Sequence, residues 1–298
     1  MVKSLRGEFM SNKLFKGYIM VIVSAVIYGC MPLMAKYIYA DGVNPTTLVL
    51  LRNLLALPSL GALSLIQSKT LKVDIKKLPY VGLLAAFGCC ITPLLLFSSY
   101  NHIASGTATV IHFIYPAAVV LGVWIVSRKR PAASVLLSVM LCVVGIALFY
   151  NPSEGFNLTG GALALISGLT FAFYIILLQR FDNTRISGFL FSFYIALSSA
   201  VIMLVYALIT NTLALPQTLT GWALCLLFAT AVTTGAVVLF QQGTFIIGGE
   251  RASILSTLEP ITSLIIGFAV FHEALGIKSI IGSIFVILAS ILIAIKKK

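Results

Sequence analysis

Three ionisable side chains in this sequence stand inside long apolar stretches, where they are the first candidates for chemistry. They are Arg52, His112 and Glu259. On insertion scales a charged group at the centre of a hydrocarbon layer costs about 2.5–3.5 kcal/mol, so each of them needs a reason to be there. Each of them is therefore a candidate for binding a polar solute or a proton.

Glu259 has the most informative surroundings. At helical spacing it shares a face with small and polar residues, namely Ala252, Ser256, Ser263 and Gly267. Such a face is expected to point into a helix bundle or a cavity. The adjacent Pro260 lacks an N–H and frees a backbone carbonyl nearby. Glu259 is thus a candidate to bind a cationic amine or to take up a coupling proton. The alternative is a protonated acid that hydrogen bonds to a neighbouring helix.

His112 and Arg52 each allow two interpretations. A membrane-embedded imidazole can titrate near neutral pH, but a lone histidine is often only a satisfied hydrogen-bonding residue. Arg52 keeps its charge and could receive a substrate carboxylate or phosphate. Its head could equally bind backbone carbonyls, or its stem could extend to the interface. The sequence leaves both alternatives open.

Other polar side chains complete a predicted pathway. The candidates are Tyr28, Tyr115, Tyr174, Gln241 and Ser256. No second histidine or carboxylate stands at ligand spacing, and the five cysteines have no histidine companions, so we expect no metal site. There is no G-x-x-x-x-G-K-[ST] sequence, no cluster of acids and no nucleophile–base pair. We predict neither a cofactor nor an enzyme activity.

The composition identifies the environment of these residues. Hydrophobic residues make up 60% and charged residues 9%, whereas globular domains carry about 25% charged residues. The apolar runs are about 18–24 residues long, which matches a helix that crosses about 30 Å of hydrocarbon. The sequence predicts an all-α integral membrane protein with ten helices, at 17–39, 45–66, 78–99, 105–127, 132–150, 159–180, 186–209, 221–243, 251–271 and 277–295.

The net charge of +12 is a topology signal. With the N-terminus in the cytoplasm, most of the Lys and Arg residues fall on the cytoplasmic side, while Asp41, Glu154 and Glu273 fall outside. This bias requires an even number of helices, so we expect both termini in the cytoplasm and the chain in the cell (plasma or inner) membrane. We expect the bilayer as a partner, and no nucleic acid.

The chain also repeats itself. Residues 17–36 resemble residues 160–179, which aligns Ser24 with Ser167, and ATVIHFIYPA at 108–117 resembles ASILSTLEPI at 252–261. The offsets are 143 and 144 positions. Because each half has an odd number of helices, the halves should be inverted, with a substrate site between them near the midplane.

The repeat gives the expected domain organisation. It consists of a cytoplasmic tail (1–16), a first five-helix repeat (17–150), a second five-helix repeat (159–295) and a basic cytoplasmic end (296–298).

Several motifs resemble the EamA type of the drug/metabolite transporter superfamily, and the likeness covers nearly the whole chain. They are Tyr28-Gly29 with Lys36, Leu51-Arg52-Asn53, Ala252-Ser253-Ile254-Leu255, Leu258-Glu259-Pro260 and His272-Glu273-Ala274-Leu275. The first half departs from the pattern, with Tyr115-Pro116 opposite Glu259-Pro260. The resemblance implies ten helices and transport of small metabolites, often export.

The resulting prediction is a secondary active transporter (a permease) for small polar metabolites that works by alternating access. Amino acids and related amphoteric solutes are the leading candidates, export is favoured, and protons are a candidate coupling partner. A lipid-carrier flippase or a non-transporting membrane subunit is the alternative. A phosphate-ester or nucleotide-sugar antiporter is a weaker one, because only Arg52 and Lys36 could serve as cavity cations. The substrate and the oligomeric state stay open.

Overall fold

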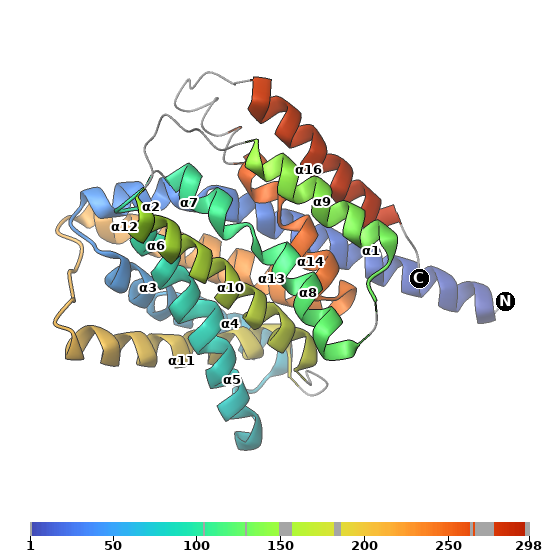
Figure 1. Cartoon of the computed structure of the whole chain (residues 1–298). Helices are drawn as coiled ribbons and strands as arrows, with labels where there is room; N and C mark the ends of the chain where they lie inside the picture. The colour runs from blue at the N-terminus through green and yellow to red at the C-terminus, as the bar shows by residue number, and fades with distance from the viewer. Residues whose placement is uncertain are drawn as a thin grey trace.

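The computed structural model describes residues 2–103, 105–128, 130–148, 157–181, 186–262, 265 and 277–295. Within these ranges all regular structure is helical, as the apolar composition predicts (Figure 1). Many large apolar side chains, such as Ile125, Leu204 and Ile209, lie exposed on the outer surfaces of the helices. An apolar surface of this extent is typical of a protein surrounded by lipid.

The helices of the first half are mostly built from two or more segments each. They are α1 (Val2–Gly29) and α2 (Met31–Ala40), α3 (Pro45–Leu54) and α4 (Leu57–Ser68), η1 (Ile75–Lys77) with α5 (Leu78–Leu84), the π-helix η2 (Ala85–Ile91) and α6 (Thr92–Ser99), α7 (Ser105–His112) and α8 (Tyr115–Ser127), and α9 (Ala133–Ala147).

The second half follows a similar order. It contains α10 (Leu158–Arg180), α11 (Gly188–Ile209), α12 (Leu219–Phe228) with the π-helix η4 (Ala229–Val237) and α13 (Val238–Ile247), then α14 (Gly249–Leu255) and α16 (Ile277–Ile295).

Six helical stretches are long and apolar enough to cross a membrane. They are Leu14–Ala40, Pro45–Ser68, Ile75–Ser99, Leu158–Arg180, Gly188–Ile209 and Leu219–Ile247. Shorter apolar helices cover Tyr115–Ser127, Ala133–Gly145 and Ile280–Ala289. The multi-pass membrane character is therefore confirmed, while the total of ten spans stays a prediction.

Several predicted boundaries differ from the structure. Helix α1 begins at Val2, whereas the sequence predicts the first helix from residue 17. The helix expected at 221–243 continues to Ile247, and the next begins at Gly249 rather than at residue 251. The turn between them is the single residue Gly248, whose φ of +87° is readily adopted only by glycine. The nearest charged residues, Glu250 and Arg251, lie within α14 rather than in the turn, so the hydropathy pattern predicts a longer loop than the structure has.

Prolines explain why so many helices are segmented, as their positions predict. The segments α2, α4, α6 and α8 each have a proline in their first two positions: Pro32, Pro58, Pro93 and Pro116. A proline has no N–H, so the carbonyl four residues earlier loses its helical partner. At Pro93 the affected carbonyl belongs to Cys89, and it accepts a hydrogen bond from Asn53 Nδ2 at 3.4 Å.

The helix irregularities recur at the offset of the sequence repeat. The first residues of the two π-helices, Ala85 and Ala229, are 144 positions apart. The segment breaks after His112 and after Leu255 are 143 positions apart. This recurrence agrees with a repeated backbone, although the inversion of the two halves stays a prediction.

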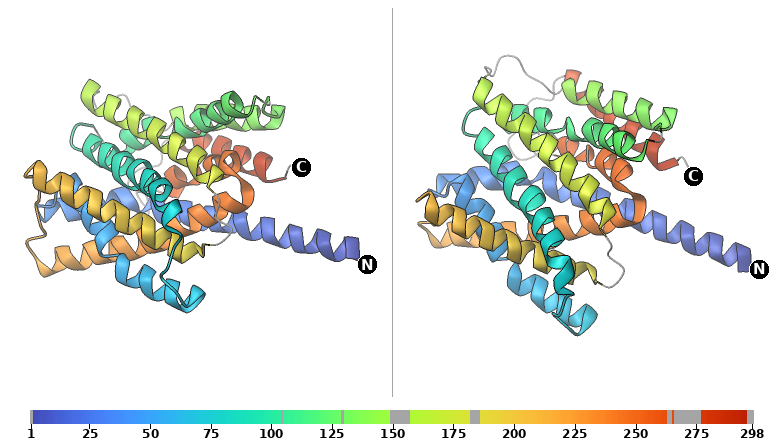
Figure 2. Two further views of the ribbon diagram at one scale, coloured as in Figure 1. Left: turned by 90° about the horizontal axis from the view of Figure 1, so that it is seen from below. Right: turned by 60° about the horizontal axis from the view of Figure 1, so that its bottom comes forward.

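Helices from the two halves pack closely together. Helix α9 lies beside α16, α1 beside α13, α10 beside α6 and α8, and α11 beside α3 and α4. The start of α1 and the end of α16 lie at the same end of the molecule (Figures 1 and 2).

At the opposite end, the turn between α2 and α3 is tied to the segment before α12. The Asp41 carboxylate accepts hydrogen bonds from the Gln217 and Thr218 backbone N–H groups at 2.9 and 3.2 Å and from the Thr218 hydroxyl at 2.7 Å. Asn44 Nδ2 donates to the Thr212 carbonyl at 2.6 Å.

Candidate functional site

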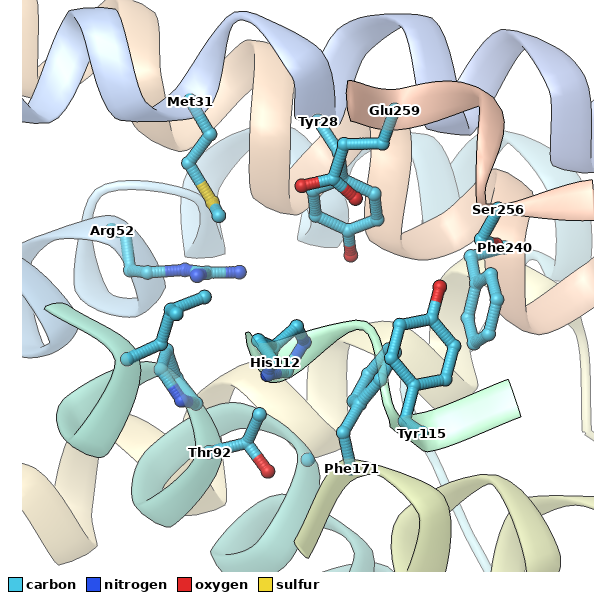
Figure 3. Close-up of a pocket in the computed structure, with 13 residues that line it drawn as sticks. Tyr28, Met31, Arg52, Thr92, His112, Tyr115, Phe171, Phe240, Ser256 and Glu259 are labelled. Carbon is cyan, nitrogen blue, oxygen red and sulfur yellow. The ribbon is translucent and has the colours of Figure 1, made fainter. Parts of the chain in front are cut away.

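A cavity of about 50 Å³ lies where segments of both halves meet. Six of the eight predicted site residues line it: Tyr28, Arg52, His112, Tyr115, Ser256 and Glu259 (Figure 3). A space of this size is large enough for a few water molecules. The lining side chains come mainly from the broken or π-helical segments, so the irregular helices surround the cavity.

Arg52 projects into the cavity from α3 and is only 4% exposed. Its Nε donates to Thr233 Oγ1 in the π-helix η4 at 3.3 Å, and its guanidinium lies 5.9 Å from the centre of the Phe228 ring. The side chain therefore does not extend to the interface, which was one of the alternatives left open by the sequence.

Glu259 enters the cavity from just beyond the break in the ninth predicted helix. Its backbone N–H donates to the Ser256 carbonyl at 3.0 Å, which is the carbonyl that Pro260 cannot serve. Ser256 shares the cavity wall with Glu259, as the predicted helix face requires. Two further members of that face, Ser263 and Gly267, lie outside the described residues.

Arg52 and Glu259 point into the cavity from different walls (Figure 3). In the described part of the chain, no hydrogen bond or ion pair joins the guanidinium to the carboxylate. The cavity wall thus carries a guanidinium and a carboxyl group that both point into the same space.

His112 and Tyr115 form the wall contributed by α7 and α8. The Nδ1 atom of His112 lies 2.8 Å from Ser167 Oγ of α10. The rings of His112 and Tyr115 are 5.3 Å apart, and both contact Phe171, at 5.6 and 4.9 Å between ring centres. Phe171 also stacks on Phe240, which closes this side of the cavity with aromatic rings.

Tyr174 and Gln241, the remaining predicted site residues, are not among the lining side chains. Ser192 donates to Gln241 Oε1 at 2.6 Å, and Gln241 Nε2 donates to the Tyr174 hydroxyl at 2.9 Å. The Tyr174 ring packs directly against Gly88, which does line the cavity. These two residues form a buried layer that supports the wall.

Several lining residues were missed by sequence reasoning: Met31, Gly88, Thr92, Pro93, Leu96, Phe171 and Phe240. The repeat offset could have found two of them. Phe171 stands 143 positions after Tyr28, and Met31 stands 143 positions before Tyr174. The same offset relates His112 to Ser256 and Tyr115 to Glu259.

The described segments contain no group of three or more His, Cys, Asp or Glu side chains placed to hold a metal ion. What the cavity offers is fixed charges, hydrogen-bonding groups and aromatic faces. Fold and site together define a multi-pass helical membrane protein with a small polar cavity between its halves.

Comparison with known proteins identifies the family. The EamA-like transporter family matches the chain twice, over residues 15–151 and 158–295, and the chain therefore belongs to this family. It is a membrane transporter, as the motifs at Arg52 and Glu259 predicted.

Curated relatives carry transporter names as well. The chain is 26% identical to "Uncharacterized transporter YcbK" of Bacillus subtilis, over 89% of this chain and 88% of the relative. It is 24% identical to "Uncharacterized inner membrane transporter YicL" of Salmonella typhimurium, over 95% and 96%. A crystal structure with 16% sequence identity superposes with a TM-score of 0.72, over 93% of this chain and 95% of that one, which shows a shared fold.

Proposed function

We propose that this transporter is a secondary active carrier of small zwitterionic metabolites, such as amino acids, that works by alternating access and favours export. In this proposal ten spans form two inverted five-helix repeats, with both termini in the cytoplasm and the protein in the plasma or inner membrane. The observation that carries the proposal is that the Arg52 guanidinium and the Glu259 carboxyl group face one cavity without contacting each other.

The two charges fit an amphoteric solute. A guanidinium binds a carboxylate through two parallel hydrogen bonds, and Arg52 cannot lose its proton to escape burial. A carboxylate at Glu259 pairs in turn with an ammonium group. A zwitterion would satisfy both groups at once, whereas a neutral or singly charged solute would leave one buried charge without a partner.

The architecture supports alternating access. Cavity residues come in pairs at the repeat offset, so the cavity sits where a pseudo-two-fold axis between inverted halves would pass. Proline breaks and π-helices surround it and supply the points at which the halves can bend. In this scheme the structure represents a closed state, whose small cavity would widen toward one side at a time.

Glu259 is the candidate coupling residue in this scheme. Proton binding would remove its charge and release the ammonium group of the solute, which links proton movement to solute movement. The other ionisable groups that face the same space are Arg52, His112, Tyr28 and Tyr115. Arg52 keeps its charge throughout, so the carboxylate end of the solute stays bound while the other end changes partner.

The phosphate-ester alternative fits this cavity less well. Arg52 is the only Lys or Arg side chain among the lining residues, and Glu259 would repel a dianion. Lys36, the other candidate cation, is exposed on α2 and does not line the cavity. A flippase or a non-transporting subunit remains the alternative from another class, and reconstitution separates it from a carrier.

The proposal is tested by counterflow into liposomes that contain the purified protein. We expect labelled amino acids to accumulate, and Arg52→Gln to reduce this at least tenfold. Lys36→Gln removes a charge from the neighbouring span outside the cavity and should leave counterflow unchanged. Exchange of a sugar phosphate in place of amino acids, or no exchange of any soluble solute, would refute the proposal.

A further inference from the structure

Two chains of hydrogen bonds run outward from the cavity wall into α10. The first starts at His112, whose Nδ1 lies 2.8 Å from Ser167 Oγ, and Ser167 Oγ lies 2.7 Å from the Ala164 carbonyl oxygen. The second starts at Thr92, whose hydroxyl lies 2.8 Å from that of Thr170. The Thr170 hydroxyl lies 2.9 Å from the Ser167 carbonyl oxygen.

The ends of both chains fix their direction. A backbone carbonyl can only accept, so Ser167 must donate to Ala164 and Thr170 must donate to Ser167. Each hydroxyl has a single hydrogen. The Ser167 hydroxyl then has no hydrogen to donate to His112. The contact of 2.8 Å between them is a hydrogen bond only if His112 Nδ1 carries a hydrogen and donates it to Ser167 Oγ. By the same reasoning Thr92 donates to Thr170.

We infer that His112 is held as the neutral Nδ1–H tautomer, so that its Nε2 is a hydrogen-bond acceptor in the cavity wall and favours solutes that bring an N–H donor. The selectivity rests on the proposed carrier function, whereas the tautomer does not. In a neutral imidazole the nitrogen without the proton is an acceptor, and here that nitrogen is Nε2.

Because His112 and Thr92 are buried, an acceptor that finds no donor in the solute is not compensated by water. His112 is 6% exposed and Thr92 is 5% exposed, and both line the cavity. A solute that leaves a buried acceptor unpaired binds more weakly, because the desolvation of that group is not compensated. Arg52, in contrast, has only donors. The cavity therefore offers hydrogen-bond donors at Arg52 and an acceptor at His112.

The tautomer is measured by ¹⁵N NMR of histidine-labelled full-length protein in nanodiscs at neutral pH. His102→Asn and His272→Asn in the same chain leave His112 as the single histidine. We expect a pyrrole-type nitrogen at Nδ1 and a pyridine-type nitrogen at Nε2. A proton on Nε2 in this protein would overturn the inference.

Ser167→Ala then tests the cause. Without the Ser167 oxygen, Nδ1–H loses its acceptor, and we expect the preference for this tautomer to be lost. The matched control is Ser24→Ala, because Ser24 is the equally buried serine 143 positions earlier and donates to the Ala236 carbonyl at 2.8 Å. If the Ser167→Ala variant is folded and His112 keeps the Nδ1–H tautomer, the inference is contradicted.

Selectivity is measured by competition in amino-acid counterflow. The probes are glycine, N,N-dimethylglycine and N,N,N-trimethylglycine, which keep the carboxylate and lose N–H donors stepwise. We expect trimethylglycine to compete at least tenfold more weakly than glycine. α-Aminoisobutyrate adds methyl groups on carbon but keeps its N–H donors, so it controls for bulk.

The outcomes separate the two proposals. Equal competition by glycine and trimethylglycine would refute the selectivity while leaving the carrier function intact. If no amino acid exchanges, the carrier function fails, and the tautomer measurement decides the inference on His112 by itself.

Discussion

The two halves of the chain line the cavity at matched positions but with different chemistry. At the repeat offset, Tyr28 corresponds to Phe171, His112 to Ser256 and Tyr115 to Glu259. Arg52 corresponds to Ile195, which is 1% exposed in the apolar core. The repeat thus preserves backbone geometry, including the π-helices and breaks, while the cation comes from one half and the anion from the other.

This difference explains how a buried arginine is tolerated in one half only. Arg52 has the Thr233 hydroxyl, the Phe228 ring and the cavity around it. Ile195 packs among apolar side chains in the main hydrophobic cluster of the described residues. The surroundings, rather than the position in the repeat, decide which residue can be charged.

The largest effect on stability is expected from a substitution that makes the second half resemble the first. Ile195→Arg would bury a charge without partners, at a cost of about 2.5–3.5 kcal/mol or more. We expect little folded protein, as measured by size-exclusion chromatography and thermal unfolding in detergent. Ile195→Val should cost only about 0.5–1.5 kcal/mol. Normal folding of Ile195→Arg would mean that this core accepts a charge as readily as the Arg52 site does.

The next largest effect, on transport, is expected from removing the carboxyl group of Glu259 in the second half. In Glu259→Gln the side chain keeps its shape but can no longer take up a proton or pair with an ammonium. We expect counterflow to fall at least tenfold, or to lose its dependence on pH, with normal expression. Glu250→Gln, which changes an acid nine residues earlier in the same region, is the control. Unchanged pH-dependent flux in Glu259→Gln would remove this carboxyl from the mechanism.

A smaller effect is expected where the first half relies on a glycine. A Cβ on Gly88 would collide with the Tyr174 ring, so Gly88→Ala should displace this ring and cost about 1–3 kcal/mol. Gly82, one turn and a half earlier, has nothing within 4 Å of an added Cβ. Gly82→Ala should therefore stabilise the helix, by up to about 1 kcal/mol. Thermal unfolding of both variants compares them directly, and equal shifts would exclude the packing explanation.

Much of this organisation could be predicted from the sequence. The low charge content and the length of the apolar runs indicate membrane helices, and isolated polar residues such as Arg52 and Glu259 in those runs indicate the cavity. Such residues are costly in hydrocarbon, so their presence carries information. The pairing of His112 with Ser167 could not be predicted, because it depends on how α7 and α10 pack.

Apolar lining residues were missed for a related reason. Phe171, Phe240 and Leu96 look like ordinary lipid-facing or core residues in a sequence that is 60% hydrophobic. Only their matched spacing with other lining residues distinguishes them. Tyr174 and Gln241 were expected in the pathway because they are polar, yet their hydrogen bonds to each other and to Ser192 satisfy them within the wall.

The smallest effect is expected far from the cavity, where the turn after α2 in the first half is tied to the second half. The Thr218 hydroxyl, together with the Thr218 and Gln217 backbone N–H groups, lowers the pKa of the Asp41 carboxyl below its ordinary value. A lowered pKa means that the folded protein favours the carboxylate. The hydrogen bonds of the Asp41 carboxylate therefore stabilise the folded protein at neutral pH. This stabilisation is lost only as the pH falls through the lowered pKa.

Asp41→Asn should lower the unfolding temperature slightly at pH 7, and the difference from the unmodified protein should vanish at strongly acidic pH. The effect is small because Asp41 is accessible to solvent, which screens its charge. Asp74→Asn is a suitable control, since the Asp74 carboxylate accepts only from the Lys76 N–H close by in the same turn. If Asp41→Asn lowered the unfolding temperature more at acidic than at neutral pH, the contribution of this turn would not depend on the Asp41 charge.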